Sequence, residues 1–317
     1  MIGDSLVDVA VGALIRSDGH VLVMQRKPGT PYAGRWEFPG GKFEAGEDAA
    51  SALARELEEE LGITPIRQRP LMRIRHDYPE RKVRLHCLKV DAWRGELVAR
   101  EGHALAWRPP ADLHALAMLD ADKPLITALK LPDRYAITAD EAPEALLAGI
   151  ERLIDHGHTL IQFRAPSLGD AFEWTAKKAI ARCRARRVTL LVNATPAVAT
   201  TLAADGIHLS AARLTQLKSR PFSADRWVAA SCHDAAELAH ARAIGCDFAV
   251  LGPVSATASH RGATPLGWDH FAALADCAGL PVIALGGMKD DDREHAWRSH
   301  GQGIAGISAW WGKGRPS

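Results

Sequence analysis

The stretch from Gly41 to Ile63 reads GKFEAGEDAASALARELEEELGI, and it decides how the first part of this chain folds. We expect a helix over Ala49 to Leu61. On such a helix Glu56, Glu59 and Glu60 are three and four residues apart, so their carboxylates share one face. The sequence therefore predicts a cluster of negative charge along one side of a single helix.

This acidic face has a cost that a bound cation would remove. Two like charges about 4 Å apart repel by about 4 kcal/mol at an effective dielectric constant of 20. A hard divalent cation cancels the repulsion, and a ligand set made only of oxygens suits Mg²⁺ or Mn²⁺. Glycines in the preceding Pro39-Gly40-Gly41 turn let the backbone approach a ligand closely, and Arg55 can pair with a neighbouring carboxylate. We expect a magnesium or manganese site here rather than a solvated acidic face.

The same stretch resembles the Nudix box, G-x5-E-x7-R-E-U-x-E-E-x-G-U with U apolar, at every position. The resemblance implies an α/β/α sandwich and a metal-bound pyrophosphate that water attacks at one phosphorus. It implies metal-binding and catalytic roles for the three glutamates Glu56, Glu59 and Glu60, and a catalytic role for Arg55. The carbonyl oxygen of Gly40 is a further expected metal ligand.

Flanking motifs resemble the MutT type, the 8-oxo-dGTP diphosphatases, over nearly all of the first 130 residues. The motifs are Trp36-Glu37-Phe38-Pro39-Gly40-Gly41-Lys42, Tyr78-Pro79-Glu80-Arg81, Arg100-Glu101-Gly102 and Asp122-Lys123-Pro124. The resemblance makes Glu101 a downstream metal ligand and assigns the purine base to Arg26, Phe38, Arg81 and Asp122. A core role for Phe38 and a solvated surface role for Arg81 are the alternatives.

Asp122 departs from this subfamily, which carries Asn at that position to contact the purine edge. An amide donates and accepts hydrogen bonds, whereas an ionised carboxylate only accepts. A protonated Asp122 could still donate. The base preference is therefore less firmly predicted than the hydrolysis.

The pattern of the chain changes near Leu131, which predicts one domain over residues 1–131 and another over residues 132–317. In the first, we expect strands at Val7–Ile15 and Val21–Gln25 and a half-buried, alternating strand at Val83–Val90. In the second, eight apolar strands alternate with helical segments, which predicts a closed parallel (β/α)8 TIM barrel. The expected strands are Tyr135–Thr138, Thr159–Phe163, Thr189–Val192, Gly206–Leu209, Trp227–Ala230, Phe248–Leu251, Pro281–Leu285 and Gly303–Ile307.

The barrel half resembles the thiamine phosphate synthase and TenI (thiazole tautomerase) superfamily from Arg134 to about Trp311. The motifs include Ile161-Gln162-Phe163-Arg164, Leu190-Leu191-Val192-Asn193, Asp205-Gly206-Ile207-His208-Leu209, Ala230-Ser231-Cys232-His233 and Ala284-Leu285-Gly286-Gly287. The resemblance implies a phosphate site at Gly286, Gly287 and Ser308 and ligand contacts from Arg164, Asn193 and His233. Glycines that merely turn the chain, and a structural His233, are the alternatives.

The synthase motifs are incomplete. Arg164 is followed by Ala165-Pro166 where the synthases carry a Lys, and Asn193 by Ala194 where they carry a magnesium-binding Asp. The synthases carry a further Asp shortly after the motif matched by His208-Leu209, but here the residues are Ala211-Ala212-Arg213. They also carry a Lys after the motif matched by Thr257-Ala258-Ser259, but here the residue is His260. Without these charges a diphosphate leaving group is poorly stabilised, so we do not expect thiamine phosphate synthesis.

The composition indicates which cellular compartment and which classes of binding partner to expect. Five cysteines show no C-x-x-C spacing, and we expect them to be small buried residues in a reducing compartment. A formal net charge of +1 favours neither a nucleic-acid polymer nor a membrane surface. The start has no basic region before an apolar stretch, and no apolar run reaches about 18 residues. We therefore expect a cytoplasmic protein.

Together these features predict a Mg²⁺-dependent hydrolase that converts 8-oxo-dGTP or a related oxidised purine nucleoside triphosphate to the monophosphate and pyrophosphate. One alternative is an enzyme of thiamine metabolism, with the Nudix half cleaving a thiamine or pyrimidine diphosphate and the barrel binding a phosphorylated thiazole. Another makes the barrel a non-catalytic module that binds a phosphorylated metabolite and regulates hydrolysis.

Overall fold

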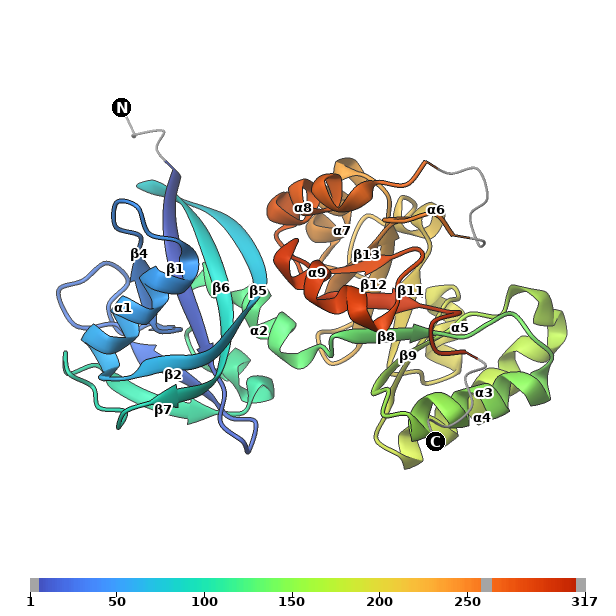
Figure 1. The fold of residues 1–317 in the computed structure, drawn as a ribbon. Coiled ribbons are helices and arrows are strands. Elements are labelled where there is room, and N and C mark those ends of the chain that lie inside the picture. Colours follow the sequence, from blue (N-terminus) through green and yellow to red (C-terminus); the bar gives the residue numbers. More distant parts are fainter. Residues whose placement is uncertain (1–5, 258–263, 312–317) are drawn as a thin grey trace. The chain divides into compact units, whose positions relative to one another are not determined.

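The computed structural model describes residues 6–257 and 264–311 (Figure 1). The chain divides into two compact units, Met1–Lys130 with Ala275–Gly279, and Leu131–Leu274 with Leu280–Ser317. Residues 258–260 of the incomplete synthase motif lie outside the described residues. None of the helices in the described part of the chain is long and apolar enough to cross a bilayer.

The first unit is built on two sheets, with strand orders β4-β1-β6-β5 and β3-β2-β7. β1 runs parallel to β6, while β5 and β6 form a long antiparallel hairpin. Two helices accompany the sheets, and α1 packs on β1 and β4. The elements are β1 (Leu6–Leu14), β2 (Val21–Gln25), β3 (Trp36–Glu37), β4 (Gly40–Lys42), α1 (Ala49–Leu61), β5 (Thr64–Tyr78), β6 (Arg81–Arg94), β7 (Ala104–Arg108) and α2 (Lys123–Lys130).

Helix α1 has the bounds that the sequence predicts. Asp48 and Ser51 form a capping box at its start, with each side chain accepting from the other residue's backbone N–H. Gly62 ends the helix with φ of 70°, a left-handed conformation that glycine adopts without strain. Leu53, Leu57 and Leu61 are fully buried, so the other side of the helix carries the glutamates.

The expected strand at Val83–Val90 is present within β6, but the expectation that it alternates and is half-buried is wrong. β6 is longer, and Leu85, His86, Cys87 and Leu88 are all buried in succession. The reason is that both faces of the strand are covered. Leu85 and Cys87 belong to one apolar core, and Leu88 belongs to the other.

The expected barrel is confirmed: within the described residues, eight parallel strands close in the order β10-β11-β12-β13-β14-β15-β8-β9. They are β8 (Arg134–Ile137), β9 (Leu160–Phe163), β10 (Thr189–Val192), β11 (Gly206–Leu209), β12 (Trp227–Cys232), β13 (Phe248–Leu251), β14 (Val282–Leu285) and β15 (Gly303–Gly306). The helices are α3 (Pro143–Asp155), α4 (Phe172–Ala185), α5 (Pro196–Thr201), α6 (Ala211–Leu214), α7 (Ala235–Ile244), α8 (Gly267–Ala278) and α9 (Arg293–Arg298).

Large side chains fill the barrel interior, so the barrel is a packed core with a cavity at its mouth. Tyr135, Phe248 and Ile283 are fully buried in one apolar cluster with residues from most other strands. Of the five cysteines, all free, four are buried as expected, while Cys277 is exposed.

Candidate functional site

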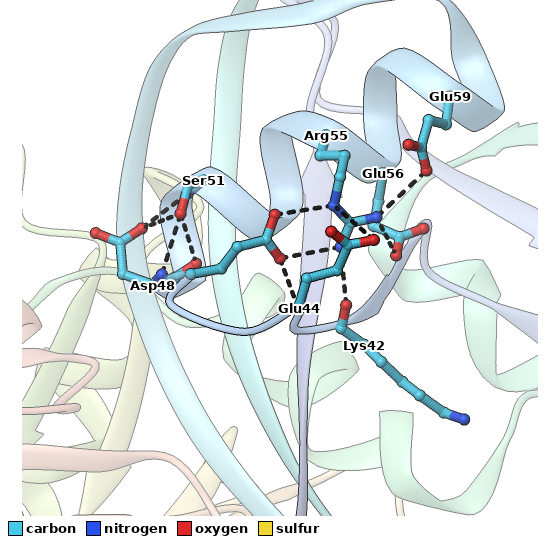
Figure 2. A network of polar contacts seen from close by, with 8 residues as sticks. Lys42, Glu44, Asp48, Ser51, Arg55, Glu56 and Glu59 are labelled. Atoms are coloured by element: carbon cyan, nitrogen blue, oxygen red, sulfur yellow. Dashed lines mark hydrogen bonds and ion pairs between the residues drawn. The ribbon is translucent and has the colours of Figure 1, made fainter.

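Arg55 organises the acidic face of α1 (Figure 2). Its Nη1 donates to Glu56 at 2.9 Å and to Glu59 at 3.2 Å. Its Nε donates to Glu47 at 2.8 Å, and its Nη2 donates to the carbonyl oxygen of Lys42 at 2.9 Å. The hydrogen bonds that Arg55 donates, first those to Glu47, raise its pKa above the ordinary value. One permanent cation therefore orients two of the predicted metal ligands and ties them to the loop before the helix.

Glu60 lies in a different environment on the same helix. Burial, and next the charge of Glu56, raise the pKa of its carboxyl group to about 8, although the backbone N–H of Gly40 donates to it. Its Oε2 is buried and has no hydrogen-bond partner among the described residues. A buried carboxylate oxygen without a partner is costly, so this atom fits a bound cation. Gly40 therefore contacts Glu60 through its backbone N–H. The group predicted to bind the metal was the carbonyl oxygen of the same residue.

Glu101, a ligand that the resemblance implies, lies near Glu60 in the segment before β7, and His103 lies beside it. One ligand atom each of Glu60, Glu101 and His103 lie within 4.8 Å of one another. His103 Nε2 is 3.5 Å from Glu101 Oε2, and Lys27 Nζ donates to the same oxygen at 2.9 Å. The Nδ1 of His103 is 3.2 Å from the carbonyl oxygen of Gln25. If Nδ1 carries the proton, Nε2 presents a lone pair to the site.

Sequence reasoning missed His103. The signal was its position two residues after the predicted ligand Glu101 and directly before a strand. With it, the donors available to a cation are carboxylate oxygens and one imidazole nitrogen, a set that a divalent ion such as Mg²⁺ or Mn²⁺ fits. Glu59 is not one of the clustered residues: its side chain is 56% exposed and bonds to Arg55.

The four residues predicted to bind the base lie in different surroundings. Arg26 donates to Glu37 at 2.6 Å and Arg81 lies over the Tyr78 ring. Phe38 is only 3% exposed and belongs to an apolar core cluster, so its surroundings favour the core alternative.

Asp122 is the buried polar group of this set. It is 4% exposed, and its Oδ2 has no hydrogen-bond partner among the described residues. Burial, and next the charge of Glu37, raise the pKa of Asp122 to about 8, although the backbone N–H of Phe38 donates to it. At neutral pH this carboxyl group therefore holds a proton, which it can donate.

The barrel mouth holds a cavity of about 660 Å³, a size typical of small-molecule sites. It lies at the carboxyl ends of the strands. All the residues predicted for this half line it, namely Arg164, Asn193, His233, Gly286, Gly287 and Ser308. Among them, His233 Nδ1 lies 2.9 Å from Glu237 Oε2, and the same oxygen accepts the backbone N–H of His233.

A chain of polar groups lies at the floor of this cavity, and Gln162, Asn193, His208 and Ser231 line it. Tyr135 OH is 3.1 Å from Nδ1 of His208, whose Nε2 is 2.8 Å from the Ser231 hydroxyl. Gln162 Nε2 donates to the Tyr135 hydroxyl, and Asn193 Nδ2 donates to Gln162. Burial lowers the pKa of His208 to about 3, so its ring is neutral. Sequence reasoning quoted Gln162 only as part of a motif and placed Tyr135 only as the start of a strand, so it gave neither residue a role in the site.

Comparisons with known proteins match two consecutive parts of the chain to two different families. The family model for the NUDIX domain matches residues 10–128, and that for thiamine monophosphate synthase matches residues 134–310. The chain is 33% identical over 124 residues to 8-oxo-dGTP diphosphatase of Escherichia coli, covering 39% of this chain and 96% of that protein.

Two other relatives are named for different enzymatic activities. CTP pyrophosphohydrolase of Escherichia coli is 38% identical over 118 residues, which are 37% of this chain and 87% of that protein. Putative thiamine-phosphate synthase 2 of Aquifex aeolicus is 29% identical over 182 residues, 57% of this chain and 98% of that protein. The chain therefore belongs to two families, the Nudix hydrolases through residues 10–128 and the thiamine monophosphate synthase family through residues 134–310.

Proposed function

We propose that the first domain, residues 1–131, hydrolyses nucleoside triphosphates to the monophosphate and pyrophosphate with Mg²⁺ as its cofactor, and that oxidised purines such as 8-oxo-dGTP are its preferred substrates. The observation that carries the proposal is the buried, unpartnered Glu60 oxygen beside Glu101. Glu60 lies on the same helix as Glu56 and Glu59, which Arg55 holds.

Mg²⁺ bound by Glu56, Glu59, Glu60 and Glu101 would polarise the phosphate chain and lower the pKa of the attacking water. Arg55 keeps the carboxylates of Glu56 and Glu59 in position, so their negative charges are oriented before substrate binds. Lys27 donates to Glu101 at 2.9 Å and so holds that carboxylate in place. The half-buried position of Glu60 gives its charge a larger effect than a solvated carboxylate has.

The preference for an oxidised purine rests on Asp122 and on the relatives' names. With a pKa of about 8, Asp122 is protonated at neutral pH and can both donate and accept, as the amide of the MutT motif does. The named relatives include an 8-oxo-dGTP diphosphatase and a CTP pyrophosphohydrolase, so a pyrimidine triphosphate is the competing substrate.

The test measures pyrophosphate release with Mg²⁺ from 8-oxo-dGTP, dGTP, CTP and thiamine diphosphate. The wild type is compared with Glu59→Gln and Glu60→Gln. The control is Glu58→Gln, because Glu58 is on the same helix but bonds to Arg100 and Thr64, away from the cluster. We expect 8-oxo-dGTP to have the highest kcat/KM and the two test variants to lose about a hundredfold or more. A preference for CTP or thiamine diphosphate would overturn the substrate assignment, and full activity in Glu60→Gln would overturn the site.

A second candidate function belongs to the barrel, a proton transfer on a thiazole phosphate of the kind the tautomerases catalyse. The observation that favours it is His233 at the cavity, with Glu237 2.9 Å from its Nδ1. The test follows conversion of a thiazole carboxylate phosphate tautomer by NMR in wild type and His233→Gln. Equal conversion by both proteins would reject this function.

A further inference from the structure

Two arginines lie together on the rim of the barrel mouth. Arg164 follows β9, and Arg213 lies in α6, directly after β11. Both line a second cavity of about 610 Å³, and Arg164 and Asn193 also line the 660 Å³ cavity. The two cavities therefore meet at these side chains.

Two amide side chains, those of half-buried Asn193 and buried Gln162, hold Arg213 in place. Its Nη1 donates to Oδ1 of Asn193 at 2.8 Å. The amide of Asn193 donates in turn to Oε1 of Gln162 at 3.2 Å. Gln162 is 2% exposed and is part of the polar chain at the floor of the cavity. Arg213 is thus positioned by the barrel interior, unlike a freely rotating surface arginine, and less side-chain entropy remains to be lost on binding.

A divalent cation does not fit this rim. The resemblance to the synthases implies magnesium held by carboxylates, but Ala194 follows Asn193, and Ala211-Ala212-Arg213 stand where the second carboxylate belongs. The oxygen of Asn193 already accepts from Arg213. A guanidinium group offers five donors and no acceptor, and its charge repels a cation.

The carboxylates near the rim do not replace the missing ligands. In the described part of the chain, Asp140 and Glu173 are the carboxylates that line these two cavities. Asp140 accepts from the backbone N–H and the hydroxyl group of Ser167. Where the synthase motifs have metal-binding carboxylates, this rim therefore has alanines and the guanidinium group of Arg213.

The described residues supply no carboxylate that neutralises the charge of this rim. Among the described residues, neither Arg164 nor Arg213 forms an ion pair with a carboxylate, whereas Arg220 on the same barrel pairs with Asp247 at 2.9 Å. A guanidinium with free donors at a cavity wall suits bidentate binding of a phosphate group.

We propose that the barrel binds a phosphate-bearing small molecule without any divalent cation, with Arg213 supplying the charge that magnesium supplies in its relatives and Arg164, which matches an arginine of their motif, as the second cation. The ligand's phosphate group bonds to the two guanidinium groups, and its organic part enters the 660 Å³ cavity. This proposal does not depend on the hydrolysis assigned to residues 1–131.

The test is calorimetric titration of the full-length protein with inorganic pyrophosphate, in EDTA and then in excess Mg²⁺. Arg213→Gln is the main variant, because glutamine keeps a donor for Asn193 but removes the charge. Arg298→Ala is the control, since Arg298 is 72% exposed and pairs with Glu294 on α9. The double variant Ala194→Asp/Arg213→Asp restores carboxylates at the rim. Melting temperatures report whether each variant folds.

We expect the wild type and Arg298→Ala to bind pyrophosphate in EDTA, and Arg213→Gln to bind about tenfold more weakly or worse. The double variant should bind only when Mg²⁺ is present. Binding by the wild type only with Mg²⁺, no binding in EDTA, or equal affinity in folded Arg213→Gln would each overturn the proposal.

Discussion

The carboxyl group of Glu56 lies directly against the backbone of Gly41, so that a methyl group added to Gly41 would overlap it. The backbone of Gly41 is not in the left-handed region, so alanine could adopt the same conformation. What requires glycine here is the approach of the carboxylate. The turn before α1 and the helix itself thereby define one position for Glu56.

Gly41→Ala should fold but bind Mg²⁺ about 10–100-fold more weakly, because Glu56 must move away from the position in which Arg55 holds it. The measurement is Mg²⁺ affinity by calorimetry, with the melting temperature of the metal-free protein. Glu58→Gln serves as the control for a changed α1 surface. An unchanged affinity in Gly41→Ala would mean that the position of Glu56 does not matter to the metal.

Binding of Mg²⁺ should release about one proton per chain at neutral pH. Glu60 has a pKa of about 8 without metal, so it is protonated there and must lose its proton to become a ligand. The affinity should rise with pH and level off above about pH 8. Because this pKa is raised in the folded state, Glu60 also makes the metal-free protein less stable as pH rises from its unfolded value of 4.5 towards 8.

Calorimetry in buffers of different ionisation enthalpy counts these protons. Glu60→Gln, which has no proton to lose at this position, is the control and should release none from it. Metal binding by the wild type without proton release would contradict the protonated state of Glu60.

Substrate affinity at saturating Mg²⁺ should fall as pH rises through about 8, because Asp122 then loses the proton with which it donates to the base. Saturating metal removes the opposite effect of Glu60. Loss of one hydrogen bond to a buried partner corresponds to about a tenfold rise in KM. In Asp122→Asn the amide always donates, and the profile should be flat in this range. Identical pH profiles of KM in the two proteins would exclude this role.

His103 should increase the preference of the metal site for Mn²⁺ over Mg²⁺. The reason is that an imidazole nitrogen binds first-row transition-metal ions better than it binds Mg²⁺. His103→Gln should therefore weaken Mn²⁺ binding, measured by electron paramagnetic resonance, more than Mg²⁺ binding. His114, an exposed histidine of the same unit, provides the control variant His114→Gln. Equal losses for both ions would place His103 in a purely structural role.

Gly149→Ala should destabilise the barrel, although alanine in a helix is ordinarily about 1 kcal/mol better than glycine. Gly149 lies in α3, and an added methyl group would overlap the ring of Trp311. Such overpacking costs about 1–3 kcal/mol, which outweighs the helix propensity. Thermal unfolding checks the sign. In a Trp311→Ala background the same substitution should become stabilising, and a stabilising effect in both backgrounds would refute the packing argument.

The sequence by itself determined the local elements and the chemistry of the Nudix helix. The bounds of α1 follow from Asp48, Gly62 and the spacing of its leucines, all within the helix or next to it. The barrel strands were predictable because parallel strands buried on both faces are short apolar runs. Glu56, Glu59 and Glu60 share a face because their spacing along the helix is three and four residues.

The tertiary structure alone decided what surrounds those residues. Whether Phe38 faces the core, whether Asp122 holds a proton, and whether His103 joins Glu60 and Glu101 all depend on segments distant in the chain. Likewise, Arg213 acquires its fixed position from Asn193, 20 residues away. Burial and electrostatic fields are sums over neighbours in space, whereas a sequence pattern reports only neighbours along the chain.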